Sequence, residues 1–386
     1  MIRLIEYKIK HNAKLQAIYK WIFSLLFKTV GLLVRVDERQ ILFFSMSGRS
    51  FGDSPRVLYD YIVNDLFFKD YKLIWAFEEP DKFSRYGLNT VKLNSFTYFT
   101  TALKSKFWIT NTSMERGLSF KPKKTILLNT WHGVPLKVIG NGYKNRYDYD
   151  YSDVNFMCYS GDYEEKIYTR GFNVRPENLV MCGLPRNDIL YQADENIKRE
   201  FKEKYHIPEG KKVILYAPTF RDVGQNSVDA ALKIPIDFKK WEKRLGDGYV
   251  VLCRMHYHTT ELLGVEYNDF VIDCTAVENI SDLYIISDIL ISDYSSSMID
   301  YSILERPIIS YAYDKDEYAT KEGFFVPLDE ALPGMVYEDE DQMLEHILNM
   351  NVDEENRKSR IVMHKYIQAK GQATIECINY LKSKIR

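Results

Sequence analysis

The chain has 386 residues and a formal net charge of −2, and 46% of its residues are hydrophobic. This length suggests two domains, or one large domain with an appendage, and the apolar content is enough for substantial cores. A near-neutral chain has no excess of lysine and arginine to neutralise phosphates, which argues against a general nucleic-acid binder. The cysteines are odd in number and include no CxxC pair, so we expect reduced core residues of a cytosolic protein. They are Cys158, Cys182, Cys253, Cys274 and Cys377.

The segment of residues 1–37 differs in composition from the rest of the chain. Its apolar side chains recur at spacings of three and four, and its first 35 residues carry seven basic residues against the single acid Glu6. The longest charge-free run, Trp21 to Phe27, is far shorter than the ~20 residues that span a bilayer, and no signal cleavage site follows. We therefore expect a basic amphipathic helix in the membrane interface. The alternative is a terminal helix packed on the protein's own core.

From residue 38 onward, short apolar runs alternate with helix-like stretches such as 56–65 and 163–169. This alternation predicts parallel sheets with helices on both faces. A charged helical link at 196–205 interrupts it, and one long charged helix is expected from about 354 to 384. We predict an α/β protein with two doubly wound, Rossmann-type domains, 38–195 and 196–386, that face a cleft. The expected strands are 41–46, 72–77, 107–110, 125–130, 154–159, 179–182, 213–216, 249–252, 270–272, 289–291 and 308–311.

Ligands of such sheets bind at the carboxyl ends of strands, so the residues that follow each strand are the candidates for a site. After the strand at 125–130 comes Trp131-His132-Gly133-Val134-Pro135-Leu136-Lys137. His132 lies on a stiff turn, and the ordinary histidine pKa of about 6.5 suits proton abstraction from a hydroxyl. Lys137 is placed to attract a phosphate. The alternatives are a hydrogen-bonded structural histidine and a merely solvated lysine.

Cations and a hydroxyl follow two further strands. Arg186 stands in the glycine-proline turn after the strand at 179–182. Thr219 and Arg221 come after the strand at 213–216, which a proline-led turn ends. Each signal is weak singly, and together they predict a phosphate-bearing substrate.

The strand at 249–252 is followed by a cation and two imidazoles. Arg254 and His256 share one side of an extended segment, so that a guanidinium and an imidazole converge on one anion. His258 has the same parity and competes for the same role.

The run Ser292-Asp293-Tyr294-Ser295-Ser296-Ser297 lies between an apolar strand and a helix-like run from Met298 to Glu305. Seryl hydroxyls and backbone N–H groups at the positive end of a helix dipole predict an anion cradle suited to phosphate. The alternative is an ordinary serine N-cap of a β-α unit. Asp300, one helical turn further on, either orients a sugar hydroxyl or supports the loop.

The order of these motifs resembles that of the CDP-glycerol:poly(glycerophosphate) glycerophosphotransferases of teichoic-acid synthesis. The matching motifs are TWHGVPLK, GLPRND, YAPTFRD, RMH, and SDYSSSMIDY followed by RPII, within about residues 105–380. The resemblance implies a GT-B-like fold, an amphipathic membrane-associating segment, and transfer of glycerol phosphate from CDP-glycerol to a polyprenyl-linked saccharide acceptor. It also implies attachment at the cytoplasmic face of the membrane.

The resemblance further implies roles for particular residues. His132 would be the general base on the acceptor hydroxyl, which attacks the β-phosphorus, and His256 with Arg254 would stabilise the phosphate and the departing CMP. Here Tyr257 and His258 follow His256 where the family usually has a proline, so the choice between the two histidines stays open. Ser295 and Ser296 would hold the pyrophosphate. The implied substrate-binding set is Gly133, Lys137, Arg186, Thr219, Arg221, Arg254, Ser295, Ser296 and Asp300.

We expect no cofactor and no obligatory metal, because the sequence shows no carboxylate cluster typical of a magnesium site. The modest length suggests a primase-type enzyme that adds one or few units. Ribitol phosphate transfer from CDP-ribitol and assembly of a phosphate-containing capsule remain open, since one extra hydroxymethyl group changes few pocket contacts. A nucleotide-sugar glycosyltransferase of the GT-B type, with Glu305 on the ribose, is a further alternative. The non-enzymatic alternative is a membrane-bound scaffold.

Overall fold

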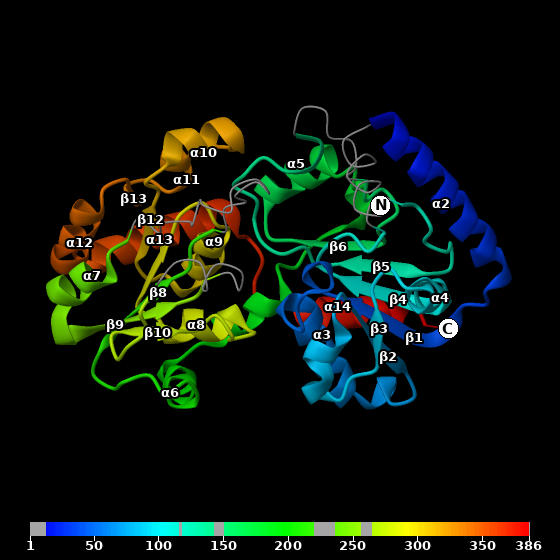
Figure 1. Cartoon of the computed structure of the whole chain (residues 1–386), viewed down its shortest axis with the longest axis horizontal. Coiled ribbons are helices and arrows are strands. Elements are labelled where there is room, and N and C mark those ends of the chain that lie inside the picture. The colour runs from blue at the N-terminus through cyan, green and yellow to red at the C-terminus, as the bar shows by residue number, and fades with distance from the viewer. Residues whose placement is uncertain (1–12, 116–117, 143–149, 220–235, 256–264, 386) are drawn as a thin grey trace.

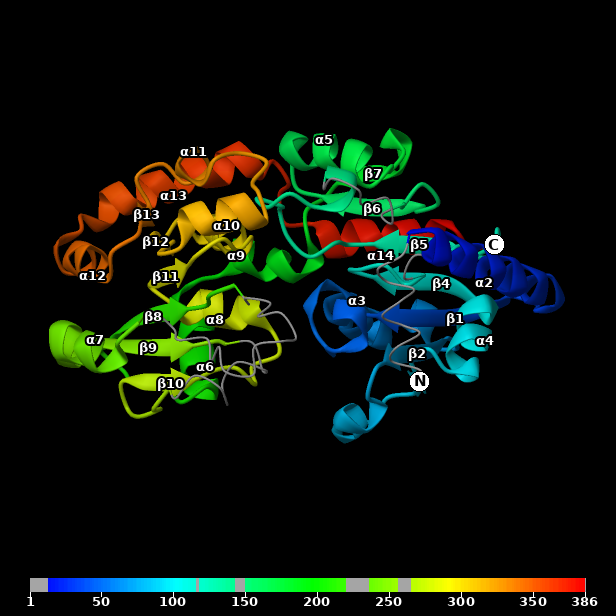
Figure 2. The same cartoon turned by 45° about the horizontal axis from the view of Figure 1, so that its top comes forward.

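Two parallel β-sheets, one in each half of the chain, form the two lobes of the protein (Figures 1 and 2). The computed structural model describes residues 13–115, 118–142, 150–219, 236–255 and 265–385. The strand orders are β3-β2-β1-β4-β5-β6-β7 and β10-β9-β8-β11-β12-β13, and every paired strand is parallel. Each order runs outward from its first strand to both sides, as in doubly wound folds, which confirms the predicted α/β fold with two parallel sheets.

The strands are short and most lie within two residues of the predicted runs. β3 and β13 were not predicted, because each is an edge strand of at most three residues with little apolar signal. The bounds are β1 Asp37–Phe44, β2 Lys72–Phe77, β3 Thr90–Lys92, β4 Ser105–Thr110, β5 Ile126–Asn129, β6 Phe156–Tyr159, β7 Leu179–Met181, β8 Lys212–Tyr216, β9 Tyr249–Cys253, β10 Val271–Asp273, β11 Ile289–Ser292, β12 Ile308–Tyr311 and β13 Val336–Tyr337.

Helices connect the strands and cover the sheets. The described helices are α2 Ala13–Leu33, α3 Asp53–Asn64, α4 Phe96–Lys104, α5 Asp162–Gly171, α6 Glu195–Lys204, α7 Phe238–Leu245, α8 Ile280–Ile286, α9 Ser297–Tyr301, α10 Lys315–Lys321, α11 Leu328–Ala331, α12 Glu340–Asn349, α13 Val352–Tyr366 and α14 Ala373–Ser383. A 3-10 helix, η6 Pro185–Gln192, follows β7 and leads from the first lobe to the second.

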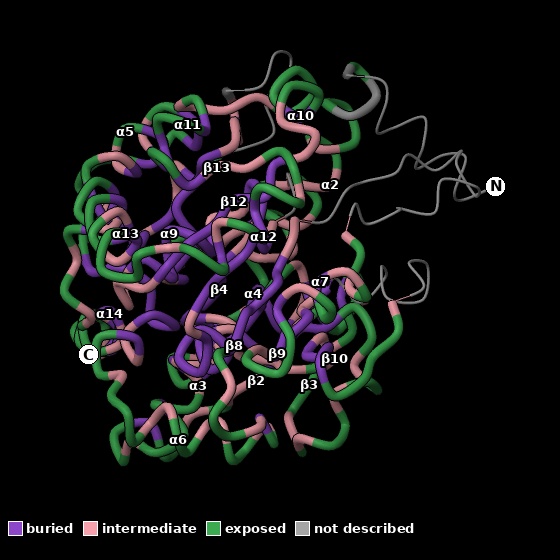
Figure 3. Tube along the Cα trace, turned by 90° about the vertical axis from the view of Figure 1, so that its left-hand side faces the viewer, coloured by how far each residue is buried: buried purple, intermediate pink, exposed green. Residues whose placement is uncertain are grey.

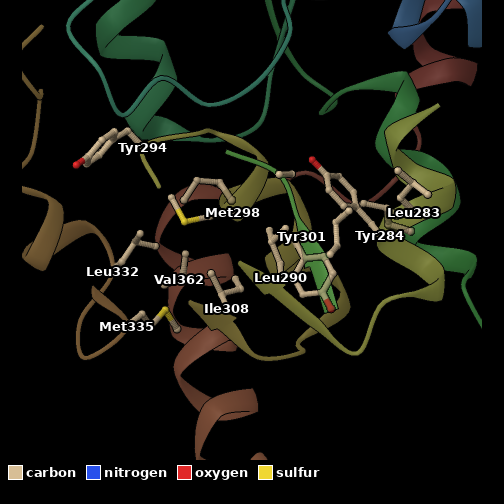
Figure 4. Packing of buried hydrophobic residues seen from close by; sticks show 14 of the residues in the cluster. Leu283, Tyr284, Leu290, Tyr294, Met298, Tyr301, Ile308, Leu332, Met335 and Val362 are labelled. Carbon is tan, nitrogen blue, oxygen red and sulfur yellow. The ribbon is translucent and has the colours of Figure 1, made fainter. Parts of the chain in front are cut away.

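Alternate residues of each strand point to opposite faces of its sheet, so each sheet supports two apolar clusters. In β8, Leu215 packs in a cluster with Met298 of α9 and Val362 of α13, the cluster shown in Figure 4. The next residue, Tyr216, packs in the cluster on the other face, which contains Trp241 of α7. Buried residues therefore concentrate in the strands and in the inner faces of the helices (Figure 3).

The C-terminal end of the chain returns to the N-terminal lobe. The predicted single helix from 354 to 384 is wrong, because α13 and α14 are separate helices, and Gly371 between them has a φ of +69°. α14 packs in the same cluster as β1, through residues such as Ile378 and Leu381 (Figures 1 and 2). Helix α14 therefore packs on the N-terminal lobe, although its residues fall within the predicted second domain, 196–386.

The fold also gathers three cysteines, Cys158, Cys182 and Cys377, whose sulfur atoms lie within 4.8 Å of one another.

Helix α2 lies along the outer side of the N-terminal lobe (Figure 1). Its inner face packs on that lobe, since Phe27 stacks on Phe99 with the ring centroids 4.0 Å apart. Its opposite face is exposed and apolar; the exposed large residues there are Ile18, Trp21, Ile22, Leu25, Leu26, Leu32 and Leu33. Among the described helices, none has the length and hydropathy of a membrane span.

Candidate active site

A cavity of about 1790 Å³ lies between the two lobes. Residues that follow β1, β4, β8 and β11 line it, and these strands are the neighbours at which the two strand orders reverse. Ligands of doubly wound sheets bind at such reversal points, outside the carboxyl ends of the strands. The cavity therefore brings the two expected ligand-binding edges face to face.

The imidazole of His132 is held at this edge by its own backbone neighbourhood. Trp131 before it has a φ of +55° and Gly133 after it a φ of +135°, so the chain turns sharply on both sides. His132 Nδ1 lies 2.7 Å from the Asn111 carbonyl oxygen, and that oxygen can only accept, so Nδ1–H donates. The neutral ring then carries its lone pair on Nε2. Burial lowers the pKa of His132, against the raising effects of the Asn111 hydrogen bond and of the Asp53 carboxylate.

Arg186, predicted to bind substrate, makes buried ion pairs within the protein. One guanidinium nitrogen donates to Asp53, and the other donates to Asp300 at 2.5 Å and to the His132 carbonyl at 2.9 Å. Asn187 donates to the second oxygen of Asp300 at 2.8 Å. Arg186 lines the cavity, but its charge is used internally.

Asp300 supports the serine loop rather than reaching the cavity. Its side chain is 1% exposed, and it does not belong to the cavity lining. Burial raises its pKa even though Arg186 and Asn187 lower it. Of the two roles left open by the sequence, the structure favours the supporting one.

The turn that carries His132 touches the serine loop across the lobe boundary. A Cβ atom placed on Gly133 would lie 2.3 Å from the Ser296 Oγ, so only glycine fits there. A second junction is a short antiparallel pairing in which Val138 N–H donates to the Gly323 carbonyl at 3.1 Å. The two lobes are therefore joined at Gly133 and Ser296, which line the cavity, and at Val138, whose neighbours Lys137 and Ile139 line it.

Hydroxyls and backbone groups of the second lobe form the facing wall. Ser295 and Ser296 line the cavity, and Ser295 Oγ accepts a hydrogen bond from Ser297 N–H at 3.2 Å. Asp293 Oδ1 accepts from Thr219 N–H at 2.8 Å, which ties the loop after β8 to the loop after β11. The predicted helix-like run from Met298 to Glu305 is a five-residue α9 followed by a 3-10 turn, so any dipole contribution is confined to one helical turn.

The remaining predicted residues fall into two groups. Lys137 and Arg254 both line the cavity, with Lys137 Nζ 5.8 Å from the Tyr318 ring centroid. Arg254 donates from Nη1 to the Val277 carbonyl, and burial lowers its pKa. The others, Arg221, His256 and His258, lie outside the described residues.

Two residues of this site were not predicted. Asp53 stands at the start of α3, and the run Gly-Asp-Ser-Pro is a helix-start signal that was available in the sequence. Asn111 follows β4 directly, where a strand-end search would have found it. Both act through partners more than 20 residues away, which no local pattern shows.

The cavity extends beyond the cleft, along the N-terminal lobe to helix α2. Lys20 of α2 lines this part, together with Glu115 and Asp153. Burial and the neighbouring Asp153 raise the pKa of Glu115 to about 7. Lys20 lies on the inner side of α2, next to Ser24, whose hydroxyl accepts from Ser119 N–H at 2.9 Å. The cavity thus extends from the strand ends to α2.

Comparisons with known proteins point to one family. The family model described as CDP-glycerol:poly(glycerophosphate) glycerophosphotransferase matches residues 26–376. A teichoic acid poly(glycerol phosphate) polymerase of Staphylococcus epidermidis is 33% identical over 347 residues, which are 84% of this chain and 47% of the relative. A teichoic acid glycerol-phosphate transferase of Staphylococcus aureus is 32% identical over 350 residues, 85% of this chain and 88% of that protein.

Solved structures agree with these relatives. A histidine-to-asparagine variant of the wall teichoic acid polymerase TagF matches with a TM-score of 0.81 and 28% identity, over 96% of each chain. The same variant soaked with CDPG matches with a TM-score of 0.80 at 28% identity, over 96% of this chain and 97% of that one. The present chain spans about half the length of the Staphylococcus epidermidis relative.

Proposed function

The chain belongs to the CDP-glycerol:poly(glycerophosphate) glycerophosphotransferase family, which confirms the resemblance found in the sequence, and from this we propose a reaction. The enzyme transfers glycerol phosphate from CDP-glycerol to a hydroxyl of a polyprenyl-pyrophosphate-linked saccharide and releases CMP, in teichoic acid synthesis. The observation that carries the proposal is the position of His132, in the cavity and directly beside the serine loop of the other lobe.

The chemistry follows from the tautomer of His132. Its Nε2 accepts the proton of the acceptor hydroxyl, and the hydroxyl oxygen forms a bond to the β-phosphorus of CDP-glycerol. The bond between that phosphorus and the bridging oxygen breaks, and CMP leaves with the electron pair. Positioning and charge stabilisation supply most of the catalysis in phosphoryl transfer.

We assign the donor to the second lobe. Ser295, Ser296 and Thr219 present hydroxyls to the pyrophosphate, and Arg254 and Lys137 supply positive charge. Gly133 lets the backbone of the turn approach the serine loop. Arg221 and either His256 or His258 complete the predicted donor site, as proposals about residues outside the described part of the chain.

We assign the acceptor to the part of the cavity that reaches α2. The exposed apolar face of α2 suits contact with lipid, while Lys20 on the other side of the helix faces the cavity. A saccharide carried on a membrane lipid would therefore enter between the membrane surface and His132. On this proposal the protein is peripheral, at the cytoplasmic face of the membrane.

The reaction is tested by acceptor-dependent release of CMP from CDP-glycerol, with CDP-ribitol and a UDP-sugar run in parallel. A synthetic polyprenyl-pyrophosphate disaccharide serves as the acceptor. The proposal expects turnover of CDP-glycerol, loss of turnover in His132→Ala, and loss in either His256→Ala or His258→Ala. Consumption of the UDP-sugar with no turnover of either CDP-alcohol would replace the proposal by a glycosyltransferase.

Membrane attachment is tested by sedimentation with vesicles that contain an anionic lipid. The double variant Trp21→Ser/Leu25→Ser removes two side chains that are 68% and 52% exposed on the outer face of α2. We expect it to stay in solution while the wild type sediments. Leu66→Ser is the matched control, because Leu66 is 83% exposed but lies far from α2 in the chain, and it should sediment like the wild type. Equal sedimentation of both variants would contradict the proposal.

A further inference from the structure

Three charged side chains form one buried unit at the lobe boundary, and each comes from a different element. Asp53 starts α3 in the first lobe, Arg186 lies in η6 between the lobes, and Asp300 lies in α9 after the serine loop. Their side chains are 11%, 7% and 1% exposed. Burying three charges is costly unless each is paired and hydrogen-bonded, and here every charge faces an opposite one.

We propose that Asp53, Arg186 and Asp300 are the positioning device of the active site, which holds the His132 turn at a fixed place against the serine loop. The proposal rests on the role of His132 proposed above. It adds three residues that act through His132 and makes Arg186 a positioning residue instead of a ligand for substrate.

The geometry of Arg186 carries this inference. Its two terminal nitrogens are bonded to Asp53, to Asp300 and to the His132 carbonyl, which leaves them committed within the protein. The same Nη2 that holds the His132 carbonyl also holds Asp300 at 2.5 Å, so the base and the serine helix share one nitrogen. The rigid fork of a guanidinium fixes both directions at once, which an ammonium cannot do.

A second contact holds the ring of His132 while Arg186 holds its backbone. The Asn111 carbonyl accepts from Nδ1, and the Trp131 ring lies 4.2 Å from the imidazole, measured between centroids. Asn111 therefore sets the orientation of the imidazole, while Asp53, Arg186 and Asp300, here called the triad, set its location. Reacting groups need this precision, because a misplacement of about 1 Å costs roughly 10²-fold in rate.

The triad also acts on the proton affinity of His132, in two directions. Among the described residues, the charged groups with the largest effect on this imidazole are Asp53 on α3, Arg186 on η6 and Lys137 on its own loop. The Asp53 carboxylate raises the pKa of His132, whereas Arg186 and Lys137 lower it, and burial lowers it most. Asp300 is not among these main causes.

The test uses three variants and a readout that needs no turnover. Histidine is labelled with ¹³C, the His132 resonance is assigned by its loss in His132→Ala, and its titration is followed by NMR. Asp53→Asn removes a negative charge and should shift the titration of His132 to lower pH. Arg186→Gln removes a positive charge and should shift it to higher pH. Asp300→Asn should leave it within experimental error of the wild type.

Kinetics supply the second half of the test. We expect each of the three variants to lower kcat by about 10²-fold, while the KM for CDP-glycerol changes much less, since the donor groups stay intact. Arg186→Lys keeps the charge and should restore the titration of His132 without restoring kcat, because the fork is lost. Thermal unfolding of every variant is measured first, and Asp53→Asn, which keeps the shape of the side chain, serves where Arg186→Gln does not fold.

Opposite titration shifts together with a selective loss of kcat support the proposal. Shifts of equal sign, or a normal kcat in Asp300→Asn, would overturn it. A large increase in the KM for CDP-glycerol with unchanged kcat in the Arg186 variants would return Arg186 to substrate binding. A wild type that does not turn over CDP-glycerol contradicts the proposed function, while the NMR titrations still decide whether the triad acts on His132.

Discussion

The two sheets share a strand order, yet their cavity-facing ends are built in different ways. At the first, the imidazole of His132 lines the cavity, with its ring held by the Asn111 carbonyl and its own carbonyl held by Arg186. At the second, the wall includes short hydroxyl side chains on the loop before the one-turn helix α9. The common topology determines where the cavity lies, and the loops determine what each wall can do. We therefore expect changes in the first wall to alter kcat and changes in the second to alter donor binding.

Removing the imidazole is the largest expected effect. His132→Ala should lower kcat by about 10³-fold, within the range that a general base contributes. The affinity for CDP-glycerol, measured by calorimetry, should stay within a few-fold of the wild type. A large loss of donor affinity in this variant would break the division between the two walls.

Gly133→Ala changes both walls at once, since the new Cβ would lie 2.3 Å from the Ser296 Oγ. We expect kcat to fall by about 10²-fold, because the base and the serine loop are pushed apart. We also expect weaker donor binding, measured in the same kinetic series.

The matched control for this clash is Gly87→Ala. Gly87 also has a positive φ, +62°, but a Cβ atom there would meet nothing within 4 Å. It therefore carries the backbone strain of roughly 1–2 kcal/mol without the contact. Normal kinetics in Gly87→Ala and in Gly133→Ala alike would show that the walls do not touch in solution.

The double variant Ser295→Ala/Ser296→Ala isolates the second wall. We expect the KM for CDP-glycerol to rise by about 10-fold, which is the loss of one or two hydrogen bonds to a charged group. The kcat at saturating donor should change less than in His132→Ala. A fall in kcat with unchanged KM would place these hydroxyls in the transition state instead.

The pH dependence sharpens the description of the first wall. Burial lowers the pKa of His132 below its ordinary 6.5, so the neutral, active form persists to lower pH. The acid limb of kcat/KM should therefore lie below pH 6.5, measured across a buffer series.

The same lowered pKa of His132 affects stability, since the unfolded chain takes up this proton first as the pH falls. The contribution of His132 to the free energy of unfolding is present above pH 6.5 and is lost below it. An acid limb above 6.5 would contradict this.

The sequence predicted where the site would form, but it did not predict the contacts within the site. Apolar runs such as 72–77 are local signals, and β2 has those bounds. His132 and Ser296 were found because each follows such a run. The close approach of Gly133, the neighbour of His132, to Ser296 depends on folding of residues 163 positions apart, which no pattern in one sequence records. Local patterns therefore predict strand ends, and only the folded chain shows which ends meet.

The partners of the buried charges were missed for the same reason. An arginine after a strand suits phosphate, and the sequence offered no sign that Arg186 has Asp53 and Asp300 as partners 133 and 114 residues away. The break between α13 and α14 is different, because Gly371 was visible in the sequence. A glycine in an apparently helical run signals a helix end as often as a tolerated weak point. The direction of α14 afterwards, back to the first lobe, is set by packing alone.

The smallest effect on activity is expected where the chain crosses back to the first lobe. Leu381 of α14 is fully buried in the cluster that contains β1, far from the cavity-lining residues in the chain. Leu381→Ala should lower the free energy of unfolding by about 2–5 kcal/mol, measured by denaturant titration, through lost apolar contact and the cavity left behind. Ile361→Ala on α13, where the side chain is 55% exposed, is the control and should cost far less. The kinetic constants of Leu381→Ala at 25 °C should match the wild type, because α14 contributes no group to either wall. A fall in kcat without loss of stability would mean that α14 sets the angle between the lobes. The residues that position His132 would then include this C-terminal helix.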